Sequence, residues 1–296
     1  MIHWTDNFGK KERLRGFIRL LNARIRYNEY YSIGRYGRFG QKFRIENHLG
    51  DQDQIAAMRN RYLGKRCFIL GNGTSLKKMN LDFLKDEITI GSNGIYRFFE
   101  EMGFATNFLL FEDVEQTEIR GPDIHKVKGP IKMAALYNAY CIKRDSNTLF
   151  FNAPRAHNSG YYWDKDLYPQ FSRDFASVVH LGSTVTYIAL QLAYHLGCNP
   201  VYLIGVDHNY GKLPSIFPPG KIEVTKENLH LVQQCHFDKN YYKIGDLIGV
   251  PWVKEQELAY KLAKEEFIRV GRAIYNAGIN SKLNVYPHTE FNKIFL

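Results

Sequence analysis

The sequence is poor in cysteine and has no long apolar run. Its four cysteines, Cys67, Cys141, Cys198 and Cys235, are far apart and form no Cys-x-x-Cys pair. This spacing argues against a disulfide framework or a zinc site and fits a reducing compartment. No stretch approaches the roughly 20 apolar residues that span a bilayer, and the first apolar run, residues 16–21, is flanked by charges, unlike a signal peptide. We therefore expect a cytoplasmic protein, soluble or peripheral at the inner face of the membrane.

Three common nucleotide-binding signatures are also missing. The glycine-rich stretch that begins at Gly71 has Leu76 where the dinucleotide fingerprint has its third glycine, and no Walker A lysine follows it. The Asp-x-Asp at residues 51–53 precedes the first expected strand and is badly placed to hold a donor diphosphate. A nicotinamide oxidoreductase therefore ranks last among the function classes. No dedicated metal site is expected.

Acidic residues are outnumbered, and the imbalance is local. Forty Lys and Arg face thirty Asp and Glu, and residues 10–44 carry much of the excess. A basic balance suits an anionic partner. Residues 11–26 place apolar side chains at helical spacing among arginines, which predicts a basic amphipathic helix. This helix could lie on an anionic membrane, or it could pack on the main domain or on a second subunit. No ribonucleoprotein motif accompanies the arm, so no nucleic-acid partner is expected.

The rest of the chain alternates short apolar runs with helical patterns. This alternation predicts an α/β fold with a single doubly wound, mostly parallel sheet, Rossmann-like, with two long, irregular insertions at 114–180 and 208–250. We expect an N-terminal arm over 1–60 and a catalytic domain over 61–296. Ligands of such sheets bind beyond the carboxyl ends of the strands. The expected strands are 66–71, 87–93, 106–113, 148–153, 201–207 and 282–287, and the expected helices are 76–85, 94–103, 183–197 and 252–277.

Small polar residues follow three of these strands or begin a helix. The glycine-rich turn, residues 71–75, could bring backbone and a helix N-terminus to a phosphate, or could be an ordinary turn capped by Thr74 or Ser75. Asn93 could present its amide to a base or a ribose, or could occupy a left-handed turn position. The segment Gly182-Ser183-Thr184 could cradle an anion while it caps the following helix.

Two further residues suggest chemistry. Asp207 emerges from the most apolar strand, where a carboxylate is costly unless it is paired or near solvent, and this favours a site role. His236 lies in the insertion 208–250. A lone histidine is usually structural, but a neutral imidazole is also the usual general base.

Taken in order, these motifs resemble a known family. The run Gly71–Leu76, then Asn93, the Ser183-Thr184 pair, Tyr202–Asp207 with Tyr210 nearby, and His236 resemble the family 42 sialyltransferases. They resemble more closely the motility-associated-factor and 6-hydroxymethylpterin diphosphokinase-like proteins, over about residues 65–295. The resemblance implies a variant GT-A, single-domain Rossmann-like fold that uses CMP-activated nonulosonic acids. By this resemblance, the enzyme requires no metal-binding Asp-x-Asp and no cofactor, and Mg²⁺ could bind without being essential.

The resemblance also implies roles for individual residues. His236 matches the base, Tyr210 matches a tyrosine that donates to the departing phosphate, and the Ser183-Thr184 pair holds the donor. Two departures put the donor sugar in question: His180-Leu181 stand where the family has an arginine, and Glu112-Asp113 replace an asparagine. We expect catalytic roles for His236, Tyr210 and Asp207, and donor binding by Gly71, Asn72, Gly73, Thr74, Ser75, Asn93, Asp113, Gly182, Ser183 and Thr184.

The resulting hypothesis is a glycosyltransferase that moves a sugar from a CMP-activated donor to a cell-surface glycan or protein by direct displacement. A first alternative is an ATP-dependent pterin diphosphokinase whose Mg²⁺ is held by Glu112, Asp113 and Asp207. A second is a non-enzymatic, nucleotide-binding scaffold recruited to an anionic membrane through residues 11–44.

Overall fold

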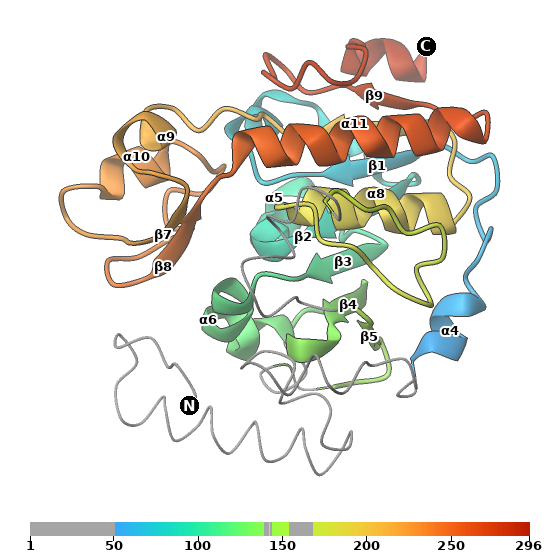
Figure 1. The fold of residues 1–296 in the computed structure, drawn as a ribbon, viewed down its shortest axis with the longest axis horizontal. Helices are drawn as coiled ribbons and strands as arrows, with labels where there is room; N and C mark the ends of the chain where they lie inside the picture. Colours follow the sequence, from blue (N-terminus) through green and yellow to red (C-terminus); the bar gives the residue numbers. More distant parts are fainter. Residues whose placement is uncertain (1–50, 139–141, 143, 154–167) are drawn as a thin grey trace.

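A seven-stranded parallel sheet forms the centre of the molecule, in the order β5-β4-β3-β2-β1-β6-β9 (Figure 1). The computed structural model describes residues 51–138, 142, 144–153 and 168–296. The expected α/β, doubly wound fold is confirmed. The strands are β1 (Cys67–Leu70), β2 (Ile88–Ser92), β3 (Phe108–Phe111), β4 (Ile131–Ala135), β5 (Thr148–Phe151), β6 (Val201–Ile204) and β9 (Ile274–Asn276).

The strand order reverses once, between β1 and β6. The chain builds outward from β1 to β5 and then returns to pair β6 with the other side of β1, with Cys67 opposite Val201. The core strands β1 and β3 are buried along their whole length. Burial on both faces explains why their sequences are continuous apolar runs with no polar alternation. A reversal of this kind opens a crevice at the carboxyl ends of the strands.

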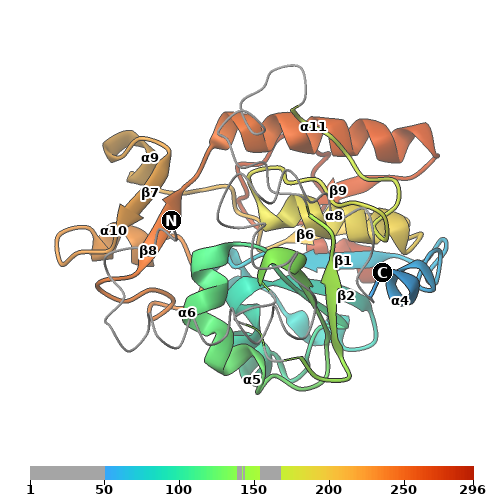
Figure 2. The ribbon, with the colours of Figure 1, turned by 60° about the horizontal axis from the view of Figure 1, so that its bottom comes forward.

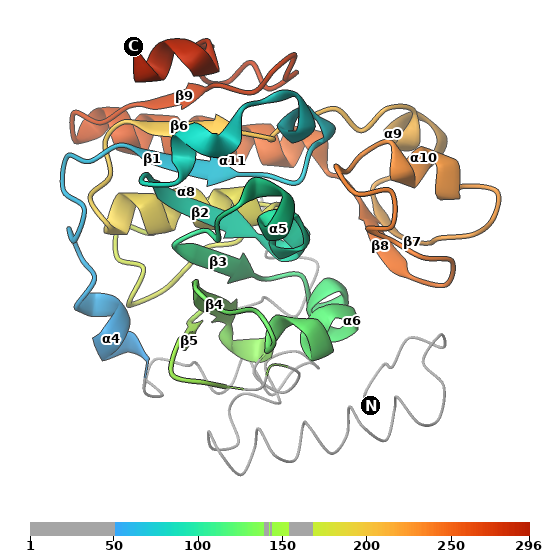
Figure 3. The ribbon, with the colours of Figure 1, turned by 180° about the vertical axis from the view of Figure 1, so that it is seen from behind.

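Two layers cover the sheet. On one face α8 (Val185–His195) packs on β1, β2 and β3, and α11 (Val253–Arg269) packs on α8 (Figure 2). The other face is covered by shorter elements and by the C-terminal segment (Figure 3). These elements are η1 (Thr74–Lys78), η2 (Leu81–Leu84), η3 (Asn93–Phe98), α5 (Phe99–Met102), α6 (Val114–Ile124), η4 (Leu136–Asn138) and η5 (Phe291–Phe295).

The insertion 208–250 is a small structured unit at one end of the sheet. It contains the antiparallel hairpin of β7 (Gly220–Glu223) and β8 (Leu247–Val250), with α9 (Leu213–Ile216) and α10 (Leu229–Gln233). The expectation of an irregular segment there is wrong. The insertion has its own small apolar core around Val224 and Val232, which gives these short elements something to pack on.

Several expected elements differ from the structure. The region 114–180 contains α6 and β4, which the sequence pattern does not predict, and the segment 282–287, expected as a strand, forms none. Lys132 is a buried lysine in β4 that pairs with Asp145. The helix expected over 252–277 ends at Arg269, because Gly271 turns the chain into a left-handed conformation (φ 71°) before β9. The helices expected over 76–85 and 94–103 are mostly 3₁₀ turns.

The end of the expected N-terminal arm contacts the main domain. The short helix α4 (Gln52–Ala56) packs against β5 and buries Ile55. Asp51 is buried and accepts a hydrogen bond from the backbone N–H of Phe150 at 2.8 Å, so this part of the Asp-x-Asp ties down an edge strand. The amphipathic helix expected over 11–26 lies outside the described residues. No helix in the described part of the chain is long and apolar enough to cross a membrane.

Candidate functional site

A cavity of about 430 Å³ lies between the carboxyl ends of β2 and β3, the start of α8 and the insertion. Its volume is within the range of small-molecule sites, which is about 300–1,000 Å³. The insertion supplies most of the apolar wall, and the strand ends and α8 supply polar groups. Six of the expected site residues line it: Asn93, Asp113, Ser183, Thr184, Tyr210 and His236.

His236 contributes a neutral imidazole to the cavity wall. Its ring stacks on Tyr241, with ring centroids 4.2 Å apart and planes at 20°, and meets Tyr242 edge-on at 5.1 Å. Burial lowers the pKa of His236 to about 4, and the backbone of Val232 opposes this shift. Its Nδ1 is buried and has no partner in the structure. The ring is therefore held at the cavity wall by its stacking on Tyr241 and Tyr242.

Tyr210 is tied to α8 through a glutamine that the sequence analysis misses. The Tyr210 hydroxyl donates to Gln256 Oε1 at 3.0 Å, and Gln256 Nε2 donates to the Ser183 carbonyl at 3.0 Å. Burial raises the pKa of Tyr210, so the phenol remains a hydrogen-bond donor at neutral pH. Gln256 lies in the first turn of α11, within a helical pattern of residues that gives no sign of a site role.

The start of α8 faces the same cavity. Ser183 has a left-handed backbone (φ 58°), and Thr184 caps the helix, its side chain accepting from the N–H of Thr186 at 3.3 Å. Ser183, Thr184 and Val185 all line the cavity. Capping and ligand contact are therefore compatible at this position. The positive end of the helix dipole favours an anion there.

Asn93 fits both interpretations of its sequence position. It has a left-handed backbone (φ 48°) directly after β2, as a turn residue would. It also lines the cavity, and its Oδ1 is buried without a partner. An unsatisfied buried acceptor costs about 1–3 kcal/mol, so a ligand that donates to this oxygen would recover that cost.

One edge of the cavity is acidic. Glu112 and Asp113 follow β3, and Asp113 caps α6 by accepting from the N–H of Gln116 at 2.8 Å. Lys221, from β7 of the insertion, places its Nζ 3.3 Å from Asp113 Oδ2. This ion pair connects the insertion to the α/β domain across the cavity edge.

The glycine-rich turn lies beside the cavity and does not line it. Asp207 Oδ2 accepts from the N–H of Ser75 at 3.0 Å and from Thr74 Oγ1 at 3.3 Å, and Asp207 also accepts from the Ser75 hydroxyl. A Cβ on Gly73 would stand 2.4 Å from the Asp207 carboxylate carbon. The turn after β1 and the loop after β6 thus meet where the strand order reverses. Their close contact requires a residue without a side chain at Gly73 and a hydrogen-bond acceptor at Asp207.

Asn72 connects this turn to the histidine segment. Its carbonyl accepts from the N–H of Phe237 at 2.9 Å. A Cβ on Gly71 would stand 2.3 Å from the Gly205 carbonyl oxygen, and one on Gly182 would stand 2.3 Å from the ring of Tyr187.

The expected site residues that do not line the cavity are Gly71, Asn72, Gly73, Thr74, Ser75, Gly182 and Asp207. Ligand-binding or catalytic roles for them stay predictions.

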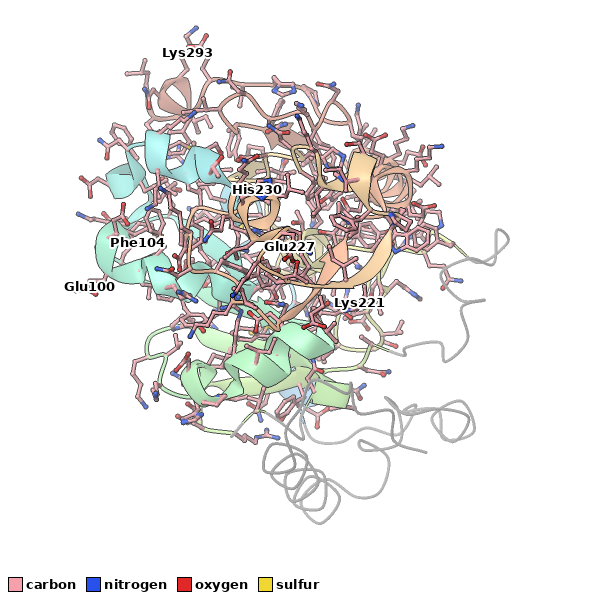
Figure 4. All side chains as sticks on the ribbon, turned by 90° about the vertical axis from the view of Figure 1, so that its left-hand side faces the viewer. Glu100, Phe104, Lys221, Glu227, His230 and Lys293 are labelled. Carbon is pink, nitrogen blue, oxygen red and sulfur yellow. The ribbon has the colours of Figure 1, made fainter. Side chains whose placement is uncertain are left out.

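Two other histidines near these motifs, His208 and His230, do not line the cavity. His208, beside Asp207, lies 3.3 Å from Glu257 Oε1, and burial lowers its pKa. His230 is exposed on α10 and lines a shallow groove on the outer face of the insertion, where Figure 4 shows it near Glu227. Among the residues that the structure describes, no three His, Cys, Asp or Glu side chains are grouped to hold a metal ion.

One family model matches the chain. The 6-hydroxymethylpterin diphosphokinase MptE-like family profile matches residues 45–212. No curated protein matches the chain. Among solved structures, the MAf glycosyltransferase from Magnetospirillum magneticum AMB-1 is similar at 13% identity and a TM-score of 0.47, over 85% of this chain and 40% of that one. The chain thus spans about two-fifths of the length of that protein. The match over more than half of its residues shows that the chain belongs to the 6-hydroxymethylpterin diphosphokinase MptE-like family.

Proposed function

We propose that the chain is a glycosyltransferase that takes its sugar from a CMP-activated donor bound in the cavity. The observation that carries the proposal is that His236 and the start of α8 line the same cavity. One provides a neutral imidazole and the other the positive end of a helix dipole. A displacement with a phosphate leaving group needs both a proton acceptor and stabilisation of negative charge.

The reaction is a direct displacement at the anomeric carbon. The acceptor hydroxyl gives its proton to His236, its oxygen forms the new bond to the anomeric carbon, and the bond from that carbon to the phosphate oxygen breaks. CMP leaves with the electron pair. Ser183, Thr184 and the hydroxyl of Tyr210 are placed along the cavity to stabilise the departing phosphate, once Tyr210 turns from Gln256.

The protonation state of His236 is consistent with a base that becomes stronger once the donor is bound. With its pKa at about 4, the imidazole is neutral at physiological pH and is free to accept a proton. It is then a weak base. A bound phosphate would raise the pKa, because an opposite charge favours the imidazolium form. The donor would therefore strengthen the base that acts on the acceptor.

A second candidate function is an ATP-dependent diphosphokinase. Glu112 and Asp113 line the cavity, and Mg²⁺ is commonly held by one or two carboxylates together with substrate phosphates. Asp207, the third carboxylate considered for this role, is engaged by Ser75 and Thr74. The two candidates differ in the nucleotide that they bind and in their dependence on a divalent cation.

A thermal-shift panel of CMP, UDP, GDP, ADP and ATP, each with and without Mg²⁺ or Mn²⁺, tests both. A ligand that binds only the folded state raises the melting temperature by mass action. We expect CMP to stabilise the protein more than any nucleoside diphosphate, with or without metal. Strong stabilisation by ATP that requires Mg²⁺ would instead support the diphosphokinase. Strong stabilisation by UDP or GDP that requires Mn²⁺ would contradict the CMP assignment.

A role without catalysis is the remaining alternative. Binding of CMP with no transfer, together with binding of vesicles that contain anionic lipid through residues 11–44, would support a nucleotide-binding scaffold. A sugar acceptor screen with CMP-activated donors separates this outcome from transfer. The membrane-binding role of the arm is itself a proposal that rests on the sequence of that segment.

A further inference from the structure

A buried arginine stands behind the wall of the cavity. Arg120, on α6, is 4% exposed. Its Nε donates to Gln116 Oε1 at 3.1 Å, and its Nη2 donates to the carbonyl of Tyr241 at 2.7 Å. No carboxylate in the described ranges pairs with it. A buried charge without a counter-ion is costly, so its position calls for a functional explanation.

Arg120 and His236 both pack against the ring of Tyr241. The guanidinium carbon of Arg120 lies 4.2 Å from the ring centroid of Tyr241, and the centroid of the His236 ring lies 4.2 Å from the same point. The Tyr241 hydroxyl accepts from the N–H of Gly94 at 3.0 Å, which fixes the tyrosine ring to the end of β2. This cluster thus joins α6, the sheet and the insertion.

We propose that Arg120 is the positioning residue for His236: acting through the ring of Tyr241, it holds the imidazole at the cavity wall. This inference rests on the proposed role of His236 as the base. Arg120 does not line the cavity and need not touch a ligand. Its influence on the imidazole is through stacking and through its charge.

The charges around His236 favour the neutral ring. Burial is the main cause of its low pKa, and the charge of Arg120 lowers the pKa further, whereas the backbone of Val232 and the charge of Asp238 raise it. Asp238 is itself paired with Arg97 at 2.5 Å, which weakens its opposition. The titratable neighbours on the remaining sides are Tyr241 and Tyr242 beside the ring, and Glu112, Asp113, Lys221 and Cys235 along the cavity. An anionic ligand would offset the charge of Arg120, so its binding should be accompanied by proton uptake on His236.

The test is an NMR pH titration of the histidine rings in the full chain labelled with ¹³C-histidine, with the His236 signal assigned from the spectrum of His236→Gln. Arg120→Met removes the charge and should raise the His236 midpoint by roughly one pH unit. Arg272→Met is a matched control, because Arg272 also donates to a tyrosine carbonyl (Tyr194, 2.7 Å) and lies over that tyrosine's ring, at 5.1 Å. The control should leave the midpoint unchanged. A folded Arg120→Met protein with the wild-type midpoint would overturn the proposal.

Arg120→Lys provides a second measurement, which decides the matter if Arg120→Met does not fold. A lysine keeps the charge but cannot stack as a plane on Tyr241. We expect the His236 midpoint to remain low and its ring signals to broaden as the imidazole moves. Sharp signals at the wild-type shift would overturn the positioning role. Neither titration needs a donor or turnover, so the result is independent of whether the proposed transfer reaction is correct.

Discussion

At the scale of the residue, His236 is distinguished by its environment. Ten histidines are present in the chain, and burial lowers the pKa of several of them. His236 lines the cavity and has a buried, unpartnered ring nitrogen, whereas His180, whose pKa is also lowered to about 4, does not line it. A low pKa by itself therefore does not identify the base. The proposal of His236 as the base rests on the combination of a low pKa with a position at the cavity wall.

We predict that His236→Ala abolishes transfer and leaves donor affinity nearly intact. A general base acts on the acceptor proton, so its loss should lower turnover, by roughly a hundred- to ten-thousand-fold, more than binding. Steady-state kinetics and nucleotide titration of the same purified variant measure the two effects. The control is His230→Ala, since His230 is exposed on the outer face of the insertion. Near wild-type turnover of a folded His236→Ala protein would end the proposal.

A second prediction at this scale concerns Asp207. Its carboxylate accepts from the backbone and hydroxyl of Ser75 and from Thr74, so Asp207→Asn would turn an amide toward these donors. We expect a loss of about 1–3 kcal/mol in the free energy of unfolding, measured by urea denaturation. Asp82→Asn, at an exposed position, should have little effect. Unchanged stability with lost turnover would favour the catalytic role expected from the sequence.

Only some of the polar residues that line the cavity could be predicted from the sequence. Asn93, Ser183 and Thr184 could be found because they follow a strand or begin a helix, positions that face the carboxyl edge of any parallel sheet. Gln256 and Lys221 could not, since each reaches the cavity from an element whose place in the fold depends on long-range packing. The same limit applies to Arg120, which appears in the sequence as one more charge on an irregular segment.

At the scale of the element, the C-terminal 3₁₀ turn closes one face of the sheet. Phe295 stacks on Phe68 of β1 at 5.6 Å and on Phe83 at 4.8 Å. Arg66 lies over the Phe295 ring at 5.0 Å and donates to the carbonyl of Ile294 at 2.9 Å. Aromatic rings at such distances gain from burial and from their offset stacking. The turn therefore serves as a cover for β1.

We predict that Phe295→Ala destabilises the protein while Leu296→Ala does not. Removal of the ring uncovers Phe68 and should cost roughly 2–3 kcal/mol. Leu296 is fully exposed, so its side chain contributes no burial to the fold. Chemical denaturation of both variants measures the difference. Equal stability of the two would show that the C-terminal turn does not cover the sheet in solution.

At the scale of the whole molecule, buried histidines make stability depend on pH. Burial lowers the pKa of His180 and His236 to about 4 and also lowers that of His195 and His208. In the unfolded chain a histidine titrates near about 6.5. Between these values the unfolded state binds protons that the folded state does not, so acid favours unfolding.

We therefore predict full stability above about pH 6.5 and a progressive loss as the pH falls toward about 4, on the order of 2 kcal/mol for each of His180 and His236. Urea denaturation across this pH range measures the loss. His180→Gln should flatten the dependence, whereas a change at the exposed His288 should not. A flat profile between those pH values would contradict the burial of these rings.

Our last prediction concerns the basic arm. Deletion of residues 1–44 should leave a folded domain that keeps its nucleotide affinity, because the cavity-lining residues in the described part of the chain all lie after this segment. Thermal melting and nucleotide titration of the truncated chain test it. The structured part begins with Asp51 and α4, which contact β5, so the deletion ends before these contacts. Aggregation of the truncated protein would show that the apolar stripe of the arm is part of the core or of a subunit interface.

The sequence by itself determined the class of fold and the positions of several ligand-facing turns. Buried parallel strands must be continuous apolar runs, and their carboxyl ends must carry the polar residues, so both features depend on local sequence. Only the tertiary structure decided which of these residues share one cavity. It engaged Asp207 with the glycine-rich turn, placed β9 at the sheet edge, and set Arg120 behind His236. These arrangements depend on contacts between segments far apart in the chain, for which the local pattern of residues carries no signal.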